Sequence, residues 1–210
     1  MEIYMRPVVP IKLYRSIVSG HSHRAELFVS LLDLPCTMID VDLAAGQHKQ
    51  PEFLKLNSFG QVPVIDDNGT VVSDSNAILV YLAAKYGDEC WLPRDPAGAA
   101  KVQRWLSVAA GEITYGPAAA RVGKCFGFPV DMAAATQRAE TLFAVMERIF
   151  KEQPFLAGDR ATVADVACYS YVARAPEGGI ALEPYPAIRA WLTRIEALPR
   201  FVPMIELKQS

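Results

Sequence analysis

Residues 62–86, VPVIDDNGTVVSDSNAILVYLAAKY, combine a strand hairpin with the helix that follows it. Two short apolar runs, residues 62–65 and 71–72, flank an Asn68-Gly69 pair. Asn-Gly between apolar runs is typical of a two-residue antiparallel hairpin turn. The apolar positions of residues 75–86 then recur with helical spacing. This stretch therefore predicts two antiparallel strands followed directly by a helix.

The residues upstream of this hairpin predict a crossover between two further strands. Residues 11–14 begin a strand, residues 24–34 carry a broad apolar helical face, and residues 37–42 alternate as a second strand. Pro51 opens a short helix over residues 51–56. A helical crossover makes the first two strands parallel. The first part of the chain is therefore predicted to be α/β, with a mixed four-stranded sheet.

The remainder of the chain is predicted to be all-helical. Two prolines and a glycine in residues 87–97 mark a linker, so we expect one domain at residues 10–87 and a second at residues 98–210. Thr162 and Asp165 have the spacing of a helix capping box. The expected helices are residues 101–120, 132–151, 163–174 and 187–197.

The charge and the distribution of apolar residues indicate which partners and which cellular compartment to expect. The net charge is −2 and basic residues are interspersed with acidic ones, so a nucleic-acid partner is not expected. No apolar run approaches the roughly 20 residues that span a bilayer, so no membrane segment is expected. The start, MEIYMRPVVP, lacks the layout of a secretory signal, which favours a cytoplasmic protein.

The cysteines are scattered, with no CxxC pair and no zinc-ligand spacing. We expect them to act as small buried hydrophobic residues, and we expect neither a dithiol mechanism nor a metal site. The four cysteines are Cys36, Cys90, Cys125 and Cys168. The three histidines, His21, His23 and His48, do not combine with any cysteine pair into a metal-ligand pattern.

Several segments together resemble the cytosolic glutathione S-transferase family in a serine-type, bacterial-looking form. They are LYRSIVSGHSHRAEL (13–27), NSFGQVPVI (57–65), SDSNAILVYLAAKYG (73–87), FLAGDRATVADV (155–166) and YPAIRAWLTRIEALPRF (185–201). The resemblance implies a thioredoxin-like N-terminal domain that binds glutathione as cosubstrate, and an all-helical C-terminal domain. It also implies a homodimer and a role in detoxification.

The resemblance makes Ser19 the candidate catalytic residue. A glutathione thiol has an ordinary pKa near ~8.5, so an enzyme that uses it must favour the thiolate. A hydroxyl beside a helix N-terminus offers a hydrogen-bond donor and positive potential. His21 is expected to assist, either as a neutral donor or as a cation near pH ~6.5. Which of the two contacts the sulfur stays open, whereas Ser22 is expected to cap the helix and His23 to face solvent.

The resemblance also implies a set of glutathione-binding residues. A cis Val62-Pro63 would direct the valine backbone toward the cysteinyl backbone, although an ordinary strand-edge proline is the simpler alternative. Asp74-Ser75, at a helix N-terminus, would hold an ammonium and a carboxylate, although plain helix capping is equally compatible. Gln47, His48 and Lys49 are similar to the segment that contacts the glycine carboxylate in the family, although a solvated polar loop is almost equally compatible. Gln61 is a further contact position that the resemblance implies.

An electrophile pocket is expected to involve the first long helices after the linker, with Tyr115, Arg121 and Phe126 as candidates. Aromatic residues at helical spacing are alternatively core residues. The predicted function is glutathione transfer to a small apolar electrophile. Alternatives are a glutathione-dependent reductase, peroxidase, dehalogenase or isomerase, or a non-catalytic interaction module. Position 19 is not a cysteine, which argues against a mixed disulfide on the protein.

Overall fold

The computed structural model describes residues 6–207, which form two compact units. The first unit comprises the described residues up to Leu92 together with Pro199–Ile205. The second unit comprises Pro93–Leu198 and the described residues from Glu206 onward. The division therefore differs from the predicted boundaries, because a segment near the C-terminus belongs to the first unit.

The first unit contains a four-stranded mixed sheet with the strand order β2-β1-β3-β4. Strands β1 (Ile11–Arg15) and β2 (Cys36–Asp40) pair in parallel. Strands β3 (Val64–Asp67) and β4 (Thr70–Ser73) pair antiparallel, and β3 also runs antiparallel to β1. The prediction of an α/β first part with a mixed four-stranded sheet is confirmed.

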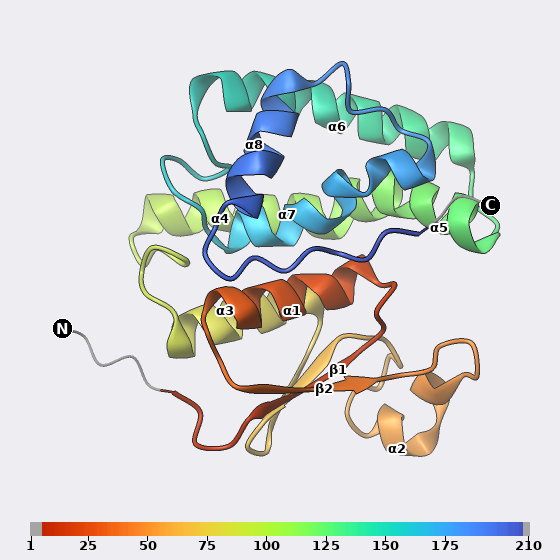
Figure 1. The fold of residues 1–210 in the computed structure, drawn as a ribbon, viewed down its shortest axis with the longest axis vertical. Coiled ribbons are helices and arrows are strands. Elements are labelled where there is room, and N and C mark those ends of the chain that lie inside the picture. The colour runs from red at the N-terminus through yellow and green to blue at the C-terminus, as the bar shows by residue number, and fades with distance from the viewer. Residues whose placement is uncertain (1–5, 208–210) are drawn as a thin grey trace. The chain divides into compact units, whose positions relative to one another are not determined.

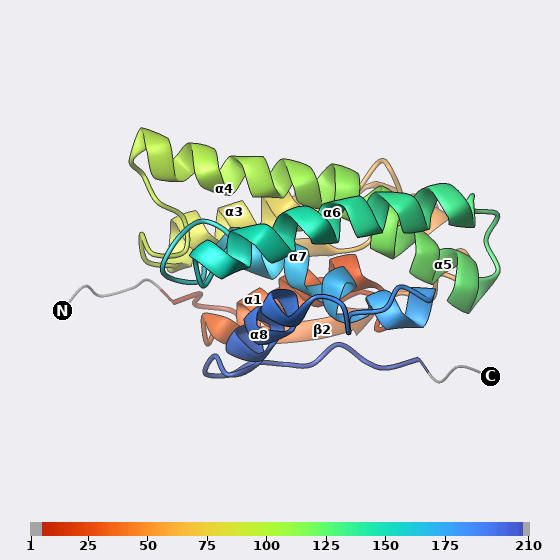
Figure 2. The same cartoon turned by 90° about the horizontal axis from the view of Figure 1, so that it is seen from above.

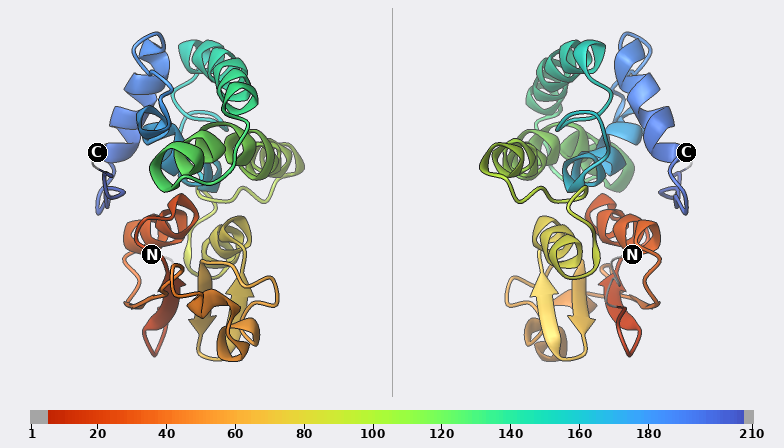
Figure 3. Two further views of the ribbon diagram at one scale, coloured as in Figure 1. Left: turned by 90° about the vertical axis from the view of Figure 1, so that its right-hand side faces the viewer. Right: turned by 90° about the vertical axis from the view of Figure 1, so that its left-hand side faces the viewer.

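Helices cover both faces of this sheet (Figures 1 and 3). Helices α1 (Gly20–Leu31) and α3 (Ser75–Tyr86) lie side by side over one face. The short helix α2 (Pro51–Leu54) lies on the other face, preceded by the 3-10 turn η1 (Gln47–Lys49). This is the thioredoxin-like arrangement that the resemblance implies.

Side chains along each strand alternate between the face covered by α1 and α3 and the face covered by α2. Leu13 pairs with Ile65, and both are completely buried. Their neighbours point to the opposite face because side chains alternate along a strand. There Phe53 of α2 packs with Val64 and Tyr14, and the Tyr14 and Phe53 rings meet edge to face with centroids 6.3 Å apart. Tyr14 is therefore a packing residue.

A buried carboxylate ties the hairpin to α3. Asp67, 2% exposed, accepts hydrogen bonds at Oδ2 from the Tyr81 hydroxyl, the Tyr86 hydroxyl and the Lys85 ammonium, at 2.6 to 2.7 Å. These donors outweigh the desolvation of the carboxyl group and lower its pKa below the ordinary value of 3.8. The ionised form of Asp67 is thus the form that stabilises the fold.

Replacing Asp67 by asparagine is expected to cost about 2 kcal/mol of unfolding free energy near neutral pH, because bonds to a charged acceptor are lost. A carboxyl group with a lowered pKa stabilises the fold above its unfolded-state pKa, and that contribution is lost as the pH falls. The difference in unfolding free energy between the wild type and Asp67→Asn should therefore be constant above about pH 5 and become smaller below about pH 4. Urea unfolding at several pH values measures it.

The neighbouring Asp66→Asn variant is the matched control. Asp66 contacts Lys12 at 3.4 Å, and that lysine side chain is half exposed, so the pair is expected to contribute under about 1 kcal/mol. The Asp66 Oδ1 atom also accepts from Gly69 N, a bond that asparagine preserves. An equal loss in both variants would contradict the role given to Asp67.

The second unit is helical, as predicted, but its first helix is longer than expected. Residues 101–120 were predicted, whereas α4 (Pro96–Val108), the π-helical segment η2 (Ala109–Ala118) and α5 (Ala119–Phe126) follow without a break. Helix α6 (Met132–Glu152) runs back along them (Figure 2).

The π-helical register of η2 has local causes. Pro117 lies inside the segment and has no N–H to donate, and its ring clashes with the α-helical carbonyl partner. The Thr114 hydroxyl donates to the Ala109 carbonyl at 2.9 Å and satisfies that group. Gly116 packs closely on α6, since a Cβ there would lie 3.2 Å from the Ala139 backbone nitrogen.

The remaining helices of this unit are centred on α7 (Val163–Ala173), whose residues are almost all buried. The 3-10 turn η3 (Ala175–Gly178) and helix α8 (Pro186–Glu196) follow it. The predicted capping box is confirmed: the Thr162 hydroxyl accepts from the first turn, and the Asp165 carboxylate accepts from Thr162 N at 2.9 Å. These bonds make the capping box a folding element of α7.

The segment Pro199–Ile205 packs along α1. His23 Nε2 donates to the Val202 carbonyl at 2.8 Å, and the Ser30 hydroxyl donates to the Arg200 carbonyl at 2.7 Å. His23 is 3% exposed, so the expectation that it faces solvent is wrong. A segment distant in sequence covers this side of α1 and gives the imidazole a main-chain partner. Within residues 6–207, no helix is long and apolar enough to cross a membrane.

Candidate active site

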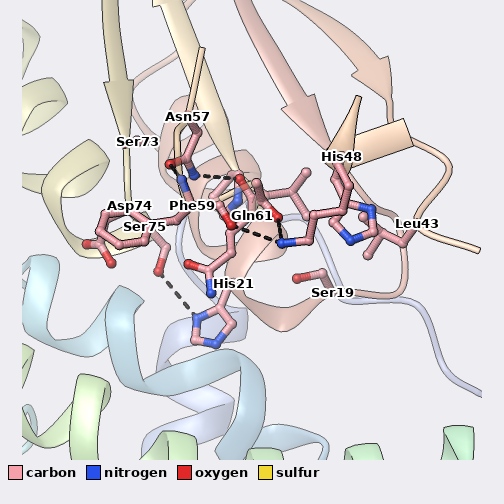
Figure 4. A pocket seen from close by; sticks show the side chains of 14 residues that line it. Ser19, His21, Leu43, His48, Asn57, Phe59, Gln61, Ser73, Asp74 and Ser75 are labelled. Carbon is pink, nitrogen blue, oxygen red and sulfur yellow. Dashed lines mark hydrogen bonds between the residues drawn. The ribbon is translucent and has the colours of Figure 1, made fainter. Parts of the chain in front are cut away.

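A cavity of about 580 Å³ lies in the first unit, a size within the range of ordinary small-molecule sites. Its walls come from the N-terminus of α1, the η1 region, the loop before β3, and the N-terminus of α3 (Figure 4). The lining residues are Ser19, His21, Leu43, His48, Lys49, Asn57, Phe59, Gly60, Gln61, Val62, Pro63, Ser73, Asp74 and Ser75.

Ser19 is the residue that begins α1. Its Oγ accepts from Ser22 N at 3.3 Å, so Ser19 is the N-cap, and the expectation that Ser22 caps the helix is wrong. Ser22 is fully buried instead, and its hydroxyl oxygen accepts from Ser16 N at 3.1 Å. Because the cap bond uses Ser19 Oγ as an acceptor, its O–H hydrogen is left to donate into the cavity.

His21 reaches from the first turn of α1 toward α3. Its Nδ1 atom lies 3.0 Å from Arg24 Nη1 and 3.4 Å from Ser75 Oγ. A guanidinium only donates, so Nδ1 is the acceptor and the ring proton is on Nε2. Desolvation and the nearby Arg24 charge lower the pKa of His21 to about 3. Of the two predicted forms of His21, the neutral donor is therefore favoured, because the imidazole is uncharged at neutral pH.

The His21 pKa leads to a direct prediction. The imidazole should show no titration between pH 8 and pH 5 in proton-carbon NMR spectra, whereas a free histidine titrates near pH ~6.5. A folded pKa below the unfolded value means that the unfolded chain binds more protons, so His21 lowers stability as the pH falls from about 6.5 toward 3. The His21→Gln variant identifies the resonance, and a midpoint above pH 6 would contradict the neutral assignment.

Asp74 and Ser75 form the opposite wall at the N-terminus of α3. Asp74 has a positive φ of 74°, which is strained for a residue other than glycine. Its Oδ1 atom accepts from Asn76 N and Ala77 N, both at 2.9 Å, so Asp74 caps the helix. Ser75 is buried, and its hydroxyl faces His21 and Arg24. The cap bonds occupy one oxygen of Asp74, and the other stays available to a cation.

A polar loop shapes the third wall. Lys49 Nζ donates to the carbonyls of Phe59 and Gly60 at 3.0 and 2.9 Å, while Asn57 Nδ2 donates to the Gln61 carbonyl at 2.9 Å (Figure 4). Gly60 has a φ of +57°, and a Cβ there would lie 2.6 Å from the His48 carbonyl oxygen. The loop therefore requires glycine, and it holds the lysine ammonium beside the cavity. The Val62-Pro63 bond is cis, as the resemblance implies.

Most of the predicted binding residues line this cavity, but Gln47 does not. Its Oε1 atom turns back to accept from Asp42 N at 2.9 Å, so its side chain closes its own loop. The cavity also includes residues that sequence reasoning missed. Asn57 and Gly60 could have been found as turn-forming residues, whereas no local pattern marks the others. The missed residues are Leu43, Asn57, Phe59, Gly60 and Ser73.

The three candidates for an electrophile pocket have different surroundings in the second unit. Arg121 is 1% exposed and pairs with Glu177 at 2.6 Å, so it stabilises α5 against η3. This buried ion pair gives Arg121 a structural role in place of the predicted pocket role. Tyr115 is 64% exposed and Phe126 is 39% exposed, so neither is a core residue.

The cysteines do not form a reactive centre. Cys168 is buried and the other three are partly buried, all as free thiols. Burial raises the pKa of the Cys36 thiol to about 11 and also raises that of Cys125, so both are protonated near neutral pH. In residues 6–207, no group of three or more His, Cys, Asp or Glu side chains is arranged to hold a metal ion.

The fold and the site together define a protein with a thioredoxin-like ligand-binding unit and a helical second unit. Residues 9–84 match the family model "Glutathione S-transferase, N-terminal domain", and residues 130–199 match "Glutathione S-transferase, C-terminal domain". The chain belongs to the glutathione S-transferase family.

Individual relatives agree with this assignment. The chain is 32% identical to human glutathione S-transferase theta-2 over 197 residues, covering 89% of this chain and 81% of that protein. It is 35% identical to glutathione S-transferase 3 of Zea mays over 211 residues, covering 92% of each. A glutathione S-transferase structure from Pseudomonas fluorescens superposes with a TM-score of 0.88 at 32% identity, covering 94% of this chain and all of that one.

Proposed function

We propose that this protein is a glutathione transferase, which holds glutathione as a thiolate for attack on a small apolar electrophile. The observation that carries the proposal is the Ser19 hydroxyl. It lines the cavity at the N-terminus of α1, and its cap bond from Ser22 N leaves its hydrogen to donate. A thiolate sulfur accepts such a bond, and the helix N-terminus also favours the anion.

Forming the glutathione thiolate near neutral pH requires only a modest stabilisation of the anion relative to the thiol. Each unit by which the thiol pKa falls corresponds to about 1.4 kcal/mol, which one hydrogen bond to a charged acceptor supplies. The thiol proton leaves to solvent, and the sulfur then forms a bond to the electrophilic carbon. The leaving group departs with its electron pair, or an activated double bond takes the electrons and then a proton. Neutral His21 assists as a donor through Nε2.

The other walls of the cavity suggest how glutathione is held. Ser75 and the first amides of α3 would accept the γ-glutamyl carboxylate, and the free oxygen of Asp74 would accept the ammonium. The Val62 main chain would pair with the cysteinyl backbone, with Gln61 and Pro63 beside it. His48 and Lys49 would hold the glycine carboxylate. Gln47 would then act by shaping the loop that carries them.

The second substrate would be recognised by apolar contact. Tyr115 and Phe126 present exposed aromatic surface in the second unit, which suits an apolar electrophile. We also propose that the protein works as a homodimer in the cytoplasm, as the family resemblance implies. Sedimentation of the purified chain would test the dimer, since a monomer at micromolar concentration would contradict it.

The decisive experiment follows the near-ultraviolet absorbance of the glutathione thiolate while the pH is titrated, with and without stoichiometric protein. We expect a thiol pKa below 7 when glutathione is bound, compared with ~8.5 for a free cysteine thiol. Binding with an unshifted thiol would favour a carrier or a glutathione-dependent reductase. No binding would favour a non-catalytic interaction module.

A further inference from the structure

Arg24 of α1 is a buried cation that lies behind the cavity wall. Its side chain is 1% exposed, and its Nη1 atom contacts two residues of that wall. These contacts are His21 Nδ1 at 3.0 Å and Ser75 Oγ at 3.2 Å. Arg24 and Ser75 are 51 positions apart in the sequence, so the contact joins the N-terminal regions of α1 and α3.

The direction of these bonds determines what the wall offers to a ligand. A guanidinium has no acceptor, so Ser75 Oγ accepts from Arg24, and its O–H hydrogen must be directed to another group. The alternative acceptor in the wall is His21 Nδ1, at a long 3.4 Å, and Nδ1 already accepts from Arg24. An anion in the cavity is a better acceptor, so the Ser75 hydroxyl is prepared to donate to one.

The positive charge of Arg24 strengthens that donation. A hydroxyl whose oxygen accepts from a cation becomes a stronger donor, and this effect is larger where water is excluded. The Ser75 hydroxyl, whose oxygen accepts from Arg24 Nη1, is therefore a stronger donor to an anion in the cavity.

We propose that Arg24 is a positioning residue that makes this site selective for a carboxylate at the γ-glutamyl end of glutathione, acting through the Ser75 hydroxyl. The proposal rests on the proposed function, because it concerns the same ligand. Arg24 itself does not touch the ligand. It orients the Ser75 hydrogen outward and keeps His21 Nδ1 occupied, so that the hydroxyl stays available.

The test measures ligand selectivity by calorimetry with three ligands. They are glutathione, the analogue that lacks the γ-glutamyl α-carboxylate (γ-aminobutyryl-cysteinylglycine), and glutathione whose glycine carboxylate is converted to an amide. Arg24→Gln should weaken glutathione binding about tenfold, the effect of losing one charge-assisted hydrogen bond. It should change binding of the decarboxylated analogue less than about twofold. Discrimination against the glycine amide should stay as in the wild type.

Two further variants separate this role from a structural one. Arg24→Lys retains the charge and should recover part of the preference for the carboxylate. Arg121→Gln removes an equally buried arginine of the second unit, and it should lower stability while leaving ligand discrimination unchanged. The double variant Arg24→Gln/Ser75→Ala should bind glutathione about as weakly as Arg24→Gln alone, without a second tenfold loss of affinity, because Arg24 acts through the Ser75 hydroxyl.

Ser75→Ala alone keeps the test informative if Arg24→Gln does not fold. It should lose as much preference for the carboxylate as Arg24→Gln, although Arg24 is still present. Full retention of the preference in Ser75→Ala would overturn the proposal, and so would an equal weakening of all three ligands in Arg24→Gln. Failure of the wild type to bind glutathione would overturn the proposed function together with this inference.

Discussion

Ser19→Ala is expected to lower kcat/KM for glutathione conjugation about a hundredfold at neutral pH, the usual cost of removing one preorganised donor to a developing anion. The loss should appear in kcat, because the proposed contact of the hydroxyl is with the sulfur and not with the ends of the tripeptide. The pH profile should shift as well. The thiol pKa of bound glutathione should rise toward ~8.5, so that the variant regains activity at alkaline pH.

The stability cost of Ser19→Ala should be small by comparison. The variant loses the cap bond to Ser22 N, which is worth about 1 kcal/mol. Ser19→Thr keeps both the cap acceptor and the donor, and should retain most of the activity. Ser22→Ala is the matched control, because its buried hydroxyl bonds Ser16 N and should affect stability without shifting the thiol pKa. Unchanged activity in Ser19→Ala would transfer the thiolate contact to His21.

Asp165→Ala is expected to cause the largest loss of stability, about 4 kcal/mol in urea unfolding, because several buried donors lose their acceptor at once. The carboxylate is completely buried and accepts four hydrogen bonds. They come from Leu156 N, Trp191 Nε1, Thr162 N and the Thr162 hydroxyl, at 2.9 to 3.2 Å. The variant leaves these donors unsatisfied in the interior and disconnects α7 from α8.

Asp95→Ala is the matched control for this effect. Asp95 caps α4 through one bond to Gly98 N at 2.8 Å, and it lies on the surface. Its loss should cost about 1 kcal/mol. Comparable values for the two variants would show that Asp165 acts only as a helix cap. Glutathione binding should be unchanged in Asp95→Ala, because this cap belongs to the second unit.

Most elements could be predicted from local pattern because their signals extend over only a few residues. The Asn68-Gly69 turn has φ angles of 50° and 90°, and the predicted helix at residues 75–86 agrees with α3 at both ends. The beginning of α1 was placed four residues too late, at residue 24. Its first turn is polar although Ser22, His23 and Arg24 are buried, so no apolar periodicity marks the start of the helix.

The candidate site was predicted less directly. The positions of Ser19, Val62 and Asp74 were inferred from a resemblance, since each alone has an ordinary structural explanation. Local pattern could not show that Gln47 turns toward its own loop, or that Arg121 is buried against Glu177. In both cases the side chain could bind a ligand or a group of the protein itself. Which of the two it binds depends on the groups that the folded chain places beside it.

The sequence by itself determined the order of strands and helices, the hairpin and the capping box, because these depend on neighbours within one or two turns. Only the tertiary structure decided which polar side chains are buried together. It brings Arg24 and His21 of α1 to Ser75 of α3, and it covers His23 with Val202. The physical reason is that burial and pKa depend on atoms close in space, whereas a local pattern reports only residues close along the chain.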